Sequence, residues 1–410
     1  MTGSTLNRFT TPWGEFGLTR FPEDPRDRLR AWDAADEYLL RRLAGDPGPE
    51  GEPVQPVDTT GHVTVFGDRW GALVTALASA RTASATSGQL TQITDSYLTQ
   101  QATWSNLARS GNPADAARLL STQDEPPARI DLLLVRVPKS LALLEDQLHR
   151  LAPSLHEGSV IIGTGMVKEI HTSTLTLFTD ILGPTRTSLA AKKARLVFST
   201  PTPSAGPQGD VHRQSNRWPG TYTLGEDATA AAGVTVTQHA GVFCADRLDI
   251  GTRFLLAHLP RSRGDERVVD LGCGNGVVGT ALALANPEAE LLFTDESYQA
   301  VASAKATYEA NVTPGRRVEF LVGDALATVA PGSVDLVVNN PPFHSHQATT
   351  DTTAWRMFSD ARRALRPGGE LWIIGNRHLG YHLKLRRLFG NCELIAGDSK
   401  FVVLRAAKRS

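Results

Sequence analysis

The chain has 410 residues, of which 41% are hydrophobic and 21% are charged, so its composition is that of a globular protein and its length favours two domains. The formal net charge of -1 excludes a uniformly basic nucleic-acid binder, although clustered basic side chains could still contact nucleic acid. The sequence has no apolar run near the roughly 20 residues that span a bilayer, no targeting signal at its start and no C-x-x-C pair, so we expect a cytoplasmic protein without a membrane segment or disulfide framework.

The first half of the sequence alternates between strand and helix patterns. Apolar residues recur at helical spacing from Pro25 to Leu43, and four prolines predict a loop from Gly45 to Pro56. Alternation of this kind favours a parallel, doubly wound α/β sheet. The predicted strands are residues 63–66, a segment near 93–94, 130–137 and 159–163, and the predicted helices are 70–80, 99–109 and 141–151.

A stretch rich in Pro, Gly, Ser, Gln and Asn separates the two halves, so we assign one domain to residues 1–200, a linker to 201–220 and a second domain to 221–410. One or two strands are expected in 221–237 and a helix in 248–259, after which the alternation resumes. The predicted strands are then 268–271, 290–294, 318–322, 334–339 and 370–374, the predicted helices are 277–285, 298–311 and 354–365, and the end of the chain resembles a hairpin at 392–397 and 400–406.

The two halves resemble each other. Residues 63–78 align with 268–283, with identical residues clustered in the expected helix, and 130–139 parallels 334–343. This similarity indicates a tandem duplication, and the alternative is a chance likeness between two α/β units. The first copy has Asp68, Arg69 and Trp70 where the second has cysteine, asparagine and intervening glycines. If the duplication is real, the first copy has lost its site.

A glycine-rich turn follows strand 268–271 and precedes a helix, as in nucleotide-binding folds. The glycines permit a tight bend and a close approach of the backbone to a ligand. Their G-x-G-x-G spacing differs from the dinucleotide fingerprint, and the preceding carboxylate suits the amino group of a methionine moiety better than a pyrophosphate. A purely structural turn is the alternative. The candidate cofactor-binding residues of this turn are Asp270, Gly272, Gly274, Asn275 and Gly276.

Polar residues also follow the next strands. Asp295 stands at the spacing expected for a carboxylate that binds ribose hydroxyls. Asp324 and Ala325 follow the third strand, where a carboxylate could meet an adenine amino group. Asn340 follows the fourth strand. Because ligands bind at the carboxyl ends of the strands in open α/β sheets, we predict that these four residues contribute to one cofactor site.

The turn Asn340-Pro341-Pro342-Phe343 must lead the chain out of the sheet, because each proline lacks a backbone N–H. It presents an amide, a free backbone carbonyl and an aromatic ring, a set that suits a planar ring with an exocyclic amino group. We therefore predict that Asn340, Pro341 and Phe343 are catalytic. His344 and His346 have the spacing of a metal pair but no third ligand, so we predict no metal.

Residues 268–375 resemble a class I S-adenosylmethionine-dependent methyltransferase, and Asn340-Pro341-Pro342-Phe343 resembles the turn of amino-directed N-methyltransferases. With residues 241–252 and the duplicated first half, the whole chain is similar to the bacterial ribosomal RNA guanine-N2 methyltransferases. The runs 169–175, 182–189 and 192–196 look most like the large-subunit member. The resemblance implies two tandem Rossmann-like α/β domains, of which the first is degenerate and helps to hold RNA, with S-adenosylmethionine as cofactor.

The reaction implied by this resemblance is methylation of the exocyclic N2 of a guanine in 23S ribosomal RNA. The Asn340 side-chain oxygen and the Pro341 carbonyl would accept the two amino hydrogens and turn the nitrogen lone pair toward the methyl group, so positioning replaces a strong base. Phe343 would stack on the extruded base. The alternatives are a 16S ribosomal RNA methyltransferase, a protein glutamine methyltransferase and an RNA-binding assembly factor without turnover.

Two groups of basic residues stand out because neither half is basic overall. We predict that they contact RNA phosphates, and the alternative is an ordinary solvated surface. The sequence gives no oligomeric state, and a monomer is the starting expectation. The first group is Arg186, Lys192, Lys193 and Arg195, and the second is Arg377, His378, Lys384, Arg386 and Arg387.

Overall fold

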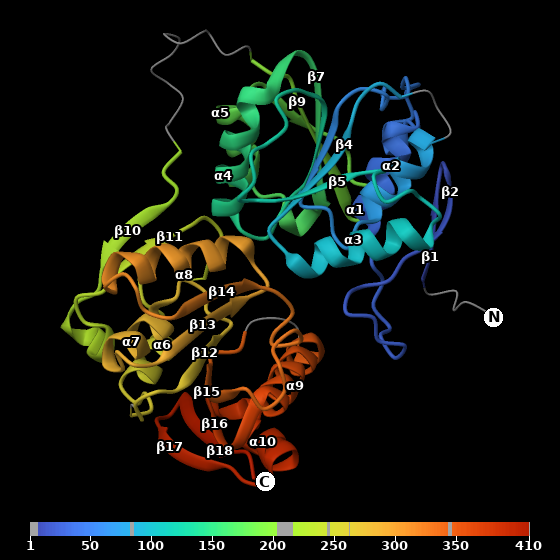
Figure 1. Ribbon diagram of the computed structural model, residues 1–410. Coiled ribbons are helices and arrows are strands. Elements are labelled where there is room, and N and C mark those ends of the chain that lie inside the picture. Colours follow the sequence, from blue (N-terminus) through green and yellow to red (C-terminus); the bar gives the residue numbers. More distant parts are fainter. Residues whose placement is uncertain are drawn as a thin grey trace. The chain divides into compact units, whose positions relative to one another are not determined.

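The computed structural model describes residues 7–82, 86–202, 216–243, 247–261, 263–342 and 347–409. The chain divides into two compact units, Met1–Arg217 and Trp218–Ser410 (Figure 1). Most of the linker expected from the sequence lies outside the described residues, as do Phe343, His344 and His346. None of the described helices combines the length and the apolar character needed to cross a membrane.

The first unit contains a seven-stranded sheet with the order β5-β4-β3-β6-β7-β9-β8. Its first five strands are parallel, whereas β9 runs antiparallel to both β7 and β8. A separate hairpin, β1 with β2, precedes it. The elements are β1 Arg8–Thr11, β2 Gly14–Gly17, α1 Ala34–Leu43, β3 Val63–Phe66, α2 Ala72–Thr82, β4 Leu90–Thr94, α3 Tyr97–Arg109, β5 Arg118–Ser121, β6 Ile130–Arg136, α4 Leu141–Leu151, β7 Leu155–Met166, α5 Thr172–Ile181, β8 Thr185–Thr187 and β9 Ala194–Ser199, with short 3-10 turns η2 Gly48–Glu50, η3 Ala152–Ser154 and η4 Val167–Glu169.

The second unit repeats this arrangement with the sheet order β14-β13-β12-β15-β16-β18-β17 and the hairpin β10 with β11. Strand for strand, the order and direction match those of the first unit, so the tandem duplication and the α/β fold class expected from the sequence are confirmed. The elements are β10 Gly220–Thr223, η5 Glu226–Ala231, β11 Thr235–Gln238, α6 Ile250–Leu256, β12 Arg267–Leu271, α7 Val277–Ala285, β13 Glu290–Asp295, α8 Tyr298–Asn311, β14 Val318–Val322, β15 Val334–Asn339, α9 Gln347–Ala364, β16 Leu365–Asn376, η6 Arg377–Leu379, α10 Tyr381–Phe389, β17 Glu393–Gly397 and β18 Phe401–Ala407.

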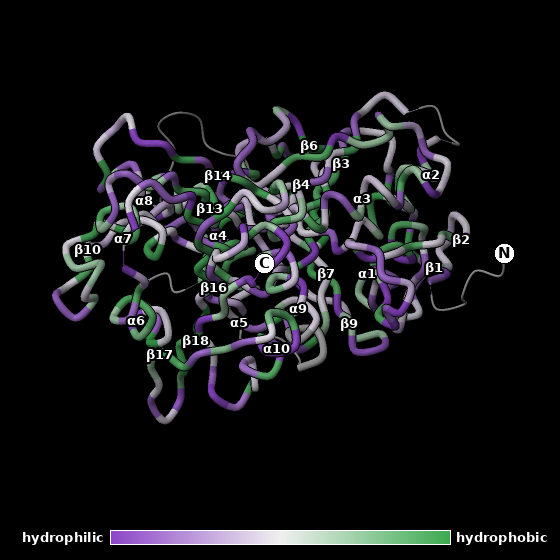
Figure 2. The backbone as a smooth tube through the Cα atoms, turned by 60° about the horizontal axis from the view of Figure 1, so that its bottom comes forward, coloured by the Kyte–Doolittle hydropathy of each residue, from purple (hydrophilic) through white to green (hydrophobic). Residues whose placement is uncertain are grey.

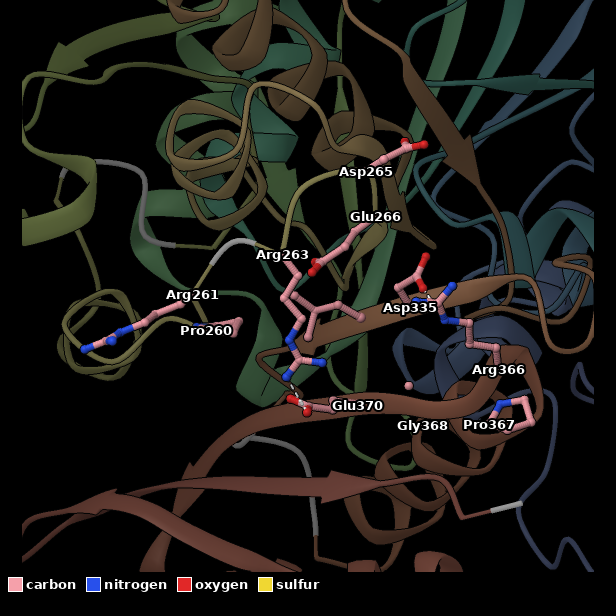
Figure 3. A pocket seen from close by; sticks show the side chains of 12 residues that line it. Pro260, Arg261, Arg263, Asp265, Glu266, Asp335, Arg366, Pro367, Gly368 and Glu370 are labelled. Atoms are coloured by element: carbon pink, nitrogen blue, oxygen red, sulfur yellow. Dashed lines mark hydrogen bonds and ion pairs between the residues drawn. The ribbon is translucent and has the colours of Figure 1, made fainter.

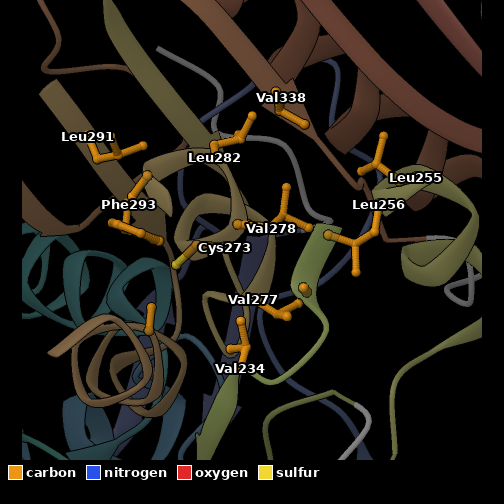
Figure 4. Close-up of a cluster of buried hydrophobic side chains, with 14 of the residues drawn as sticks. Val234, Leu255, Leu256, Cys273, Val277, Val278, Leu282, Leu291, Phe293 and Val338 are labelled. Atoms are coloured by element: carbon orange, nitrogen blue, oxygen red, sulfur yellow. The ribbon is translucent and has the colours of Figure 1, made fainter. Parts of the chain in front are cut away.

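Alternating strand residues build two apolar layers in the second unit. Val268 joins the cluster under α6, α7 and α8, whereas its neighbour Val269 joins the cluster under α9 and α10. Figure 4 shows the first cluster, in which Val278 of α7 lies among the same buried side chains as Phe293 of β13. Hydrophobic stretches follow the strands, and hydrophilic segments dominate the loops (Figure 2). Each fully buried side chain of this kind contributes roughly 1.5–3 kcal/mol to stability.

The helix predicted from Pro25 to Leu43 is wrong in its first part, because α1 begins only at Ala34. Asp24 and Asp27 turn the chain before it: their side chains accept hydrogen bonds from the backbone N–H two residues later, at 2.9 Å each. Asp33 then forms the N-cap of α1 and completes a capping box with Asp36. Aspartates that bind the local backbone compete with a helix, and helical spacing of apolar residues does not reveal this competition.

Candidate functional site

The glycine-rich turn lies at the carboxyl end of β12. Gly272, Gly274 and Gly276 all have left-handed backbone angles, with φ of +71°, +52° and +77°, which other residues adopt only under strain. A Cβ atom on Gly276 would lie 2.5 Å from the Cα of Ala304, so this glycine allows α7 and α8 to approach closely. A Cβ on Gly274 would meet no atom within 4 Å. The backbone at Gly274 therefore borders open space, where a ligand can approach it.

Two carboxylates hold this turn. Asp270 is 3% exposed, and its Oδ2 accepts a hydrogen bond of 2.8 Å from the backbone N–H of Gly279 in α7. Burial raises the pKa of Asp270 to about 7. Asp295 ends β13 and accepts hydrogen bonds from the backbone N–H groups of Gly274 at 3.1 Å and Ser297 at 3.0 Å. The carboxylate expected to bind a ribose thus lies beside the glycine that borders open space.

The end of β14 adds Asp324 and Ala325. Asp324 forms an ion pair of 2.8 Å with Arg356 of α9, a partner that the sequence did not suggest. Burial raises the pKa of Asp324, and the Arg356 guanidinium opposes this shift. Ala325 has a left-handed φ of +47°, and its carbonyl accepts a hydrogen bond from the Thr294 hydroxyl at 3.2 Å. This contact ties the ends of β13 and β14 together.

Asn340 lies next to the glycine-rich turn. The strand register places Leu271 beside Asn339, and a Cβ on Gly272 would lie 3.9 Å from the backbone oxygen of Asn340. The Asn340 amide nitrogen donates a hydrogen bond of 3.0 Å to the Thr252 hydroxyl. Its side-chain oxygen is buried and has no hydrogen-bond partner among the described residues. Because an unsatisfied buried acceptor costs about 1–3 kcal/mol, this oxygen indicates a place where a ligand donates a hydrogen bond.

Asn275 contacts the hairpin of β10 and β11 with its side chain. Its side chain is 8% exposed, and Nδ2 donates to Oε1 of Gln238, at the end of β11, over 3.1 Å. Gln238 in turn donates to the Val242 carbonyl at 2.9 Å. A cofactor contact from the Asn275 side chain stays a prediction, and the role of Gln238 as an anchor for the turn was not found from the sequence.

The other predicted catalytic positions are only partly described. Pro341 is buried, and Phe343 lies outside the described residues. His344 and His346 lie outside them as well. Within the described ranges, no group of three or more His, Cys, Asp or Glu side chains is placed to hold a metal ion.

The predicted RNA-binding residues lie near the final strands of each unit. In the first unit, Arg186 is on β8, Lys192 and Lys193 form the turn before β9, and Arg195 is on β9. Both lysines have left-handed φ angles of +48° and +64°. In the second unit, Arg377 is in η6 and donates to the Asp398 carbonyl at 3.0 Å, and the remaining predicted RNA-binding residues are Lys384 and Arg386 on α10. RNA contact by these residues stays a prediction.

The edge of the first unit that corresponds to this site is closed by charged side chains. Arg136, at the position aligned with Asn340, is fully buried and lies 2.7 Å from Asp33, 3.3 Å from Asp36 and 3.0 Å from Glu169. Arg69, at the position aligned with Gly274, pairs with Asp33 at 3.1 Å and Glu169 at 3.0 Å. These charges occupy the positions that are a glycine and an amide in the second unit.

A cavity of about 240 Å³ in the second unit lies at the opposite edge of the sheet (Figure 3). Its residues surround the amino ends of β12, β15 and β16, whereas Asn340 follows the carboxyl end of β15. Arg366 pairs with Asp335 and Arg263 pairs with Glu370 across this cavity. It is therefore separate from the Asn340 site.

Two family models match the chain and together cover most of it. Residues 6–203 match the RLMG N-terminal domain, and residues 233–405 match the methyltransferase small domain. Among solved structures, the chain resembles the Thermus thermophilus protein described as a 16S rRNA N2 G1207 methyltransferase (RsmC) in complex with AdoMet and guanosine, with a TM-score of 0.69 and full coverage of both chains. At 20% identity this likeness shows the fold alone.

Sequence relatives match at much higher identity. The ribosomal RNA large subunit methyltransferase G of Streptomyces avermitilis is 66% identical over 400 residues, which is 98% of this chain and 99% of the relative. The protein of the same name from Stutzerimonas stutzeri is 45% identical over 97% of this chain and 98% of the relative. Because this identity extends over both units, the chain belongs to the ribosomal RNA large subunit methyltransferase G family.

Proposed function

We propose that the second unit transfers a methyl group from S-adenosylmethionine to the exocyclic N2 of a guanine in large-subunit 23S ribosomal RNA. The observation that carries this proposal is the buried side-chain oxygen of Asn340, which has no partner among the described residues and belongs to a residue whose backbone lies beside the glycine-rich turn. Such an acceptor requires a hydrogen-bond donor, and an exocyclic amino group supplies one. The names of the full-length relatives support the class of RNA.

The residues around the turn fit a cofactor that carries an amino acid, a ribose and an adenine. Gly274 leaves room for a close approach, Asp295 lies next to it for the ribose hydroxyls, and Asp324 follows β14 for the adenine amino group. Asp295 accepts backbone hydrogen bonds from Gly274 and Ser297, which hold its carboxylate at the end of β13. S-adenosylmethionine held by these residues would supply an electrophilic methyl group.

The chain's own part in the reaction is to orient the target amino group. Its nitrogen is a weak nucleophile because the lone pair is delocalised into the guanine ring. The Asn340 oxygen would accept one hydrogen and the Pro341 carbonyl the other, which favours a pyramidal nitrogen whose lone pair is localised and directed at the methyl group. Phe343 would stack on the extruded base. Orientation of this kind lowers the barrier without a strong base.

The first unit, residues 1–200 with the linker 201–220, would bind RNA without catalysis, and the catalytic domain would be 221–410. Support comes from the ion pairs that close its site and from the exposed Arg186, Lys192 and Lys193 near its edge strands. Arg377, Lys384 and Arg386 would add phosphate contacts in the second unit. A ribosomal RNA substrate supports a location in the cytoplasm.

The test is methyl transfer from labelled S-adenosylmethionine to separated large- and small-subunit ribosomal RNA that lack their native guanine methylation, followed by nucleoside analysis. We expect N2-methylguanosine in the large-subunit RNA. Label in the small-subunit RNA would contradict the choice of subunit. Intact cofactor binding without label in either RNA would contradict the proposal and favour a protein glutamine substrate or a binding role without turnover.

In the same assay Asn340→Ala should lower transfer by about 100-fold or more, a loss typical of a removed transition-state contact, while cofactor affinity stays within about threefold. Asn112→Ala is the matched control, because it removes an amide of the same size from the first unit, where Asn112 bonds to Ser79. Transfer by Asn340→Ala at the wild-type rate would remove this side chain from the mechanism.

A further inference from the structure

Thr252, at the start of α6, is the described partner of the Asn340 side chain. The Asn340 amide nitrogen donates to the Thr252 hydroxyl at 3.0 Å, and Thr252 is 8% exposed. Because the amide nitrogen of Asn340 is bonded to Thr252, the side-chain oxygen of Asn340 faces away from α6. That oxygen is buried without a partner among the described residues.

Thr252 is itself held firmly. It occupies the third position of α6, where its backbone N–H donates to the N-cap carboxylate of Asp249 at 3.0 Å. The neighbouring Gly251 lies against β18, since a Cβ there would come within 3.2 Å of the Phe401 ring. A β-branched side chain in a helix is restricted about χ1, and Thr keeps two rotamers there. The Thr252 backbone is therefore fixed by its N-cap contact, and in this rotamer its hydroxyl accepts the hydrogen bond from Asn340.

The first unit supplies independent evidence that this contact belongs to the duplicated fold. Asp36 holds the third position of α1, as Thr252 does in α6, and Arg136 holds the position aligned with Asn340. Their side chains meet at 3.3 Å between the Arg136 Nε and the Asp36 Oδ1, and both residues are fully buried. The two copies thus retain a side-chain pair between the same two elements. It is a charged pair in the first copy and a neutral one in the second.

This difference bears on the reaction. A carboxylate at position 252 would attract the substrate amino group or hold a cation in the site, as Asp36 holds Arg136. A neutral hydroxyl binds the amide nitrogen and adds no charge, so the Asn340 oxygen stays available. An apolar residue there would let the amide turn about its last torsion, and its nitrogen would then repel the amino group that it should bind.

We propose that Thr252 is a positioning residue for methyl transfer, which fixes the Asn340 amide with its oxygen toward the target amino group. The role rests on the proposed function of Asn340, and Thr252 does not contact the reacting atoms itself. No cofactor contact is expected from it. Its loss should therefore lower kcat and leave the KM for the cofactor unchanged.

The test compares Thr252→Val, which keeps the shape and removes the acceptor, with Thr252→Ser, which keeps the hydroxyl. We expect Thr252→Val to lower kcat about fivefold to tenfold, which corresponds to the loss of one neutral hydrogen bond, and Thr252→Ser to restore most of it. Thr307→Val is the control, because it removes a buried hydroxyl of the same unit that bonds to Thr237. It should leave kcat within about twofold.

Two results would overturn the proposal. The first is a wild-type kcat for Thr252→Val. The second is an equal loss of kcat in Thr252→Val and Thr252→Ser together with a raised KM for the cofactor, which indicates a structural role. The side-chain amide resonance of Asn340 in ¹⁵N-labelled full-length protein separates this proposal from the proposed function. Thr252→Val should shift it and speed its hydrogen exchange while Thr252→Ser does not, even if the wild type methylates neither RNA. An unchanged resonance in Thr252→Val would refute the positioning role.

Discussion

The two units share one fold but have different side chains at the carboxyl ends of β6 and β15. Arg136 in the first copy brings a guanidinium into the sheet edge, where Asp33, Asp36 and Glu169 surround it. Asn340 in the second copy brings an amide whose oxygen has no described partner. Sheet order and helix placement are the same in both copies. The fold therefore positions the edge, and a few side chains decide whether it is closed or can receive a ligand.

The comparison also shows how the first copy closes this edge. Its space is filled by two arginines and three carboxylates that form ion pairs with one another. Burial raises the pKa of Asp36 to about 6, and Arg136 opposes that shift. The closed edge is thus a structural ion cluster, whereas the open edge has the neutral amide of Asn340 in its place.

The largest effect should come from breaking the closed edge. Among the described residues, Arg136→Met removes the one cation that pairs with all three carboxylates and leaves Asp36 without an ion pair, and removal of one partner from a buried pair costs about 3–5 kcal/mol. Urea denaturation should show this loss in the free energy of unfolding, whereas Arg118→Met on the exposed face of β5 should stay within about 0.5 kcal/mol. A change in Arg136→Met no larger than in the control would contradict the role of the cluster.

The second prediction introduces the arginine of the first copy at the open edge of the second unit. Gly274→Arg places a side chain where the first copy has Arg69, and it should lower cofactor affinity about 100-fold or more, ~2.8 kcal/mol, in a calorimetric titration. Gly111→Arg is the control, because Gly111 also has a left-handed φ, of +74°, with no atom near its Cβ position. Both variants should lose about 1–2 kcal/mol of stability from backbone strain. Equal affinity in the two variants would refute a cofactor site at Gly274.

The smallest effect concerns a carboxylate that the two copies place at different sequence positions. Asp68 binds the backbone N–H of Val74 at 2.9 Å, as Asp270 binds that of Gly279, and burial raises the pKa of Asp68 to about 7. A carboxyl with a higher pKa in the folded chain binds more protons when folded, so its contribution to stability falls as pH rises from about 4 to about 7.

Asp68→Asn removes this titration, so its stability relative to wild type should rise between pH 5 and pH 7 by on the order of 1–2 kcal/mol. The measurement is the urea midpoint of both proteins at each pH. A difference between the two proteins that stays constant over this range would show that Asp68 does not titrate there.

The sequence was sufficient for features that depend on local spacing. The glycine-rich turn, the residues at successive strand ends and the Asn340 turn follow from short motifs, and the structure brings Gly272 and Asn340 together through the β12–β15 register. The repeat predicted two units of one fold, because aligned strands and helices retain their apolar patterns even where a site is lost.

The side-chain contacts that distinguish the two copies could not be predicted from local spacing in the sequence. Arg136 lies within a strand pattern, and its partner Asp33 is 103 residues earlier in the sequence. Thr252 and Asn340 are 88 residues apart, and no spacing rule joins them. Such pairs depend on how a helix packs against a sheet edge. Prediction from spacing also fails over short distances. The side-chain hydrogen bonds of Asp24 and Asp27 form turns where the apolar spacing predicted a helix, so α1 begins later than expected.

The most direct test of the difference between the two copies is the number of cofactor molecules bound by the intact chain. A calorimetric titration of the full-length protein with S-adenosylmethionine should give one molecule per chain, because the second unit alone leaves the glycine-rich turn open. Two molecules per chain would contradict this assignment, since the edge closed by Arg69 and Arg136 would then also bind the cofactor.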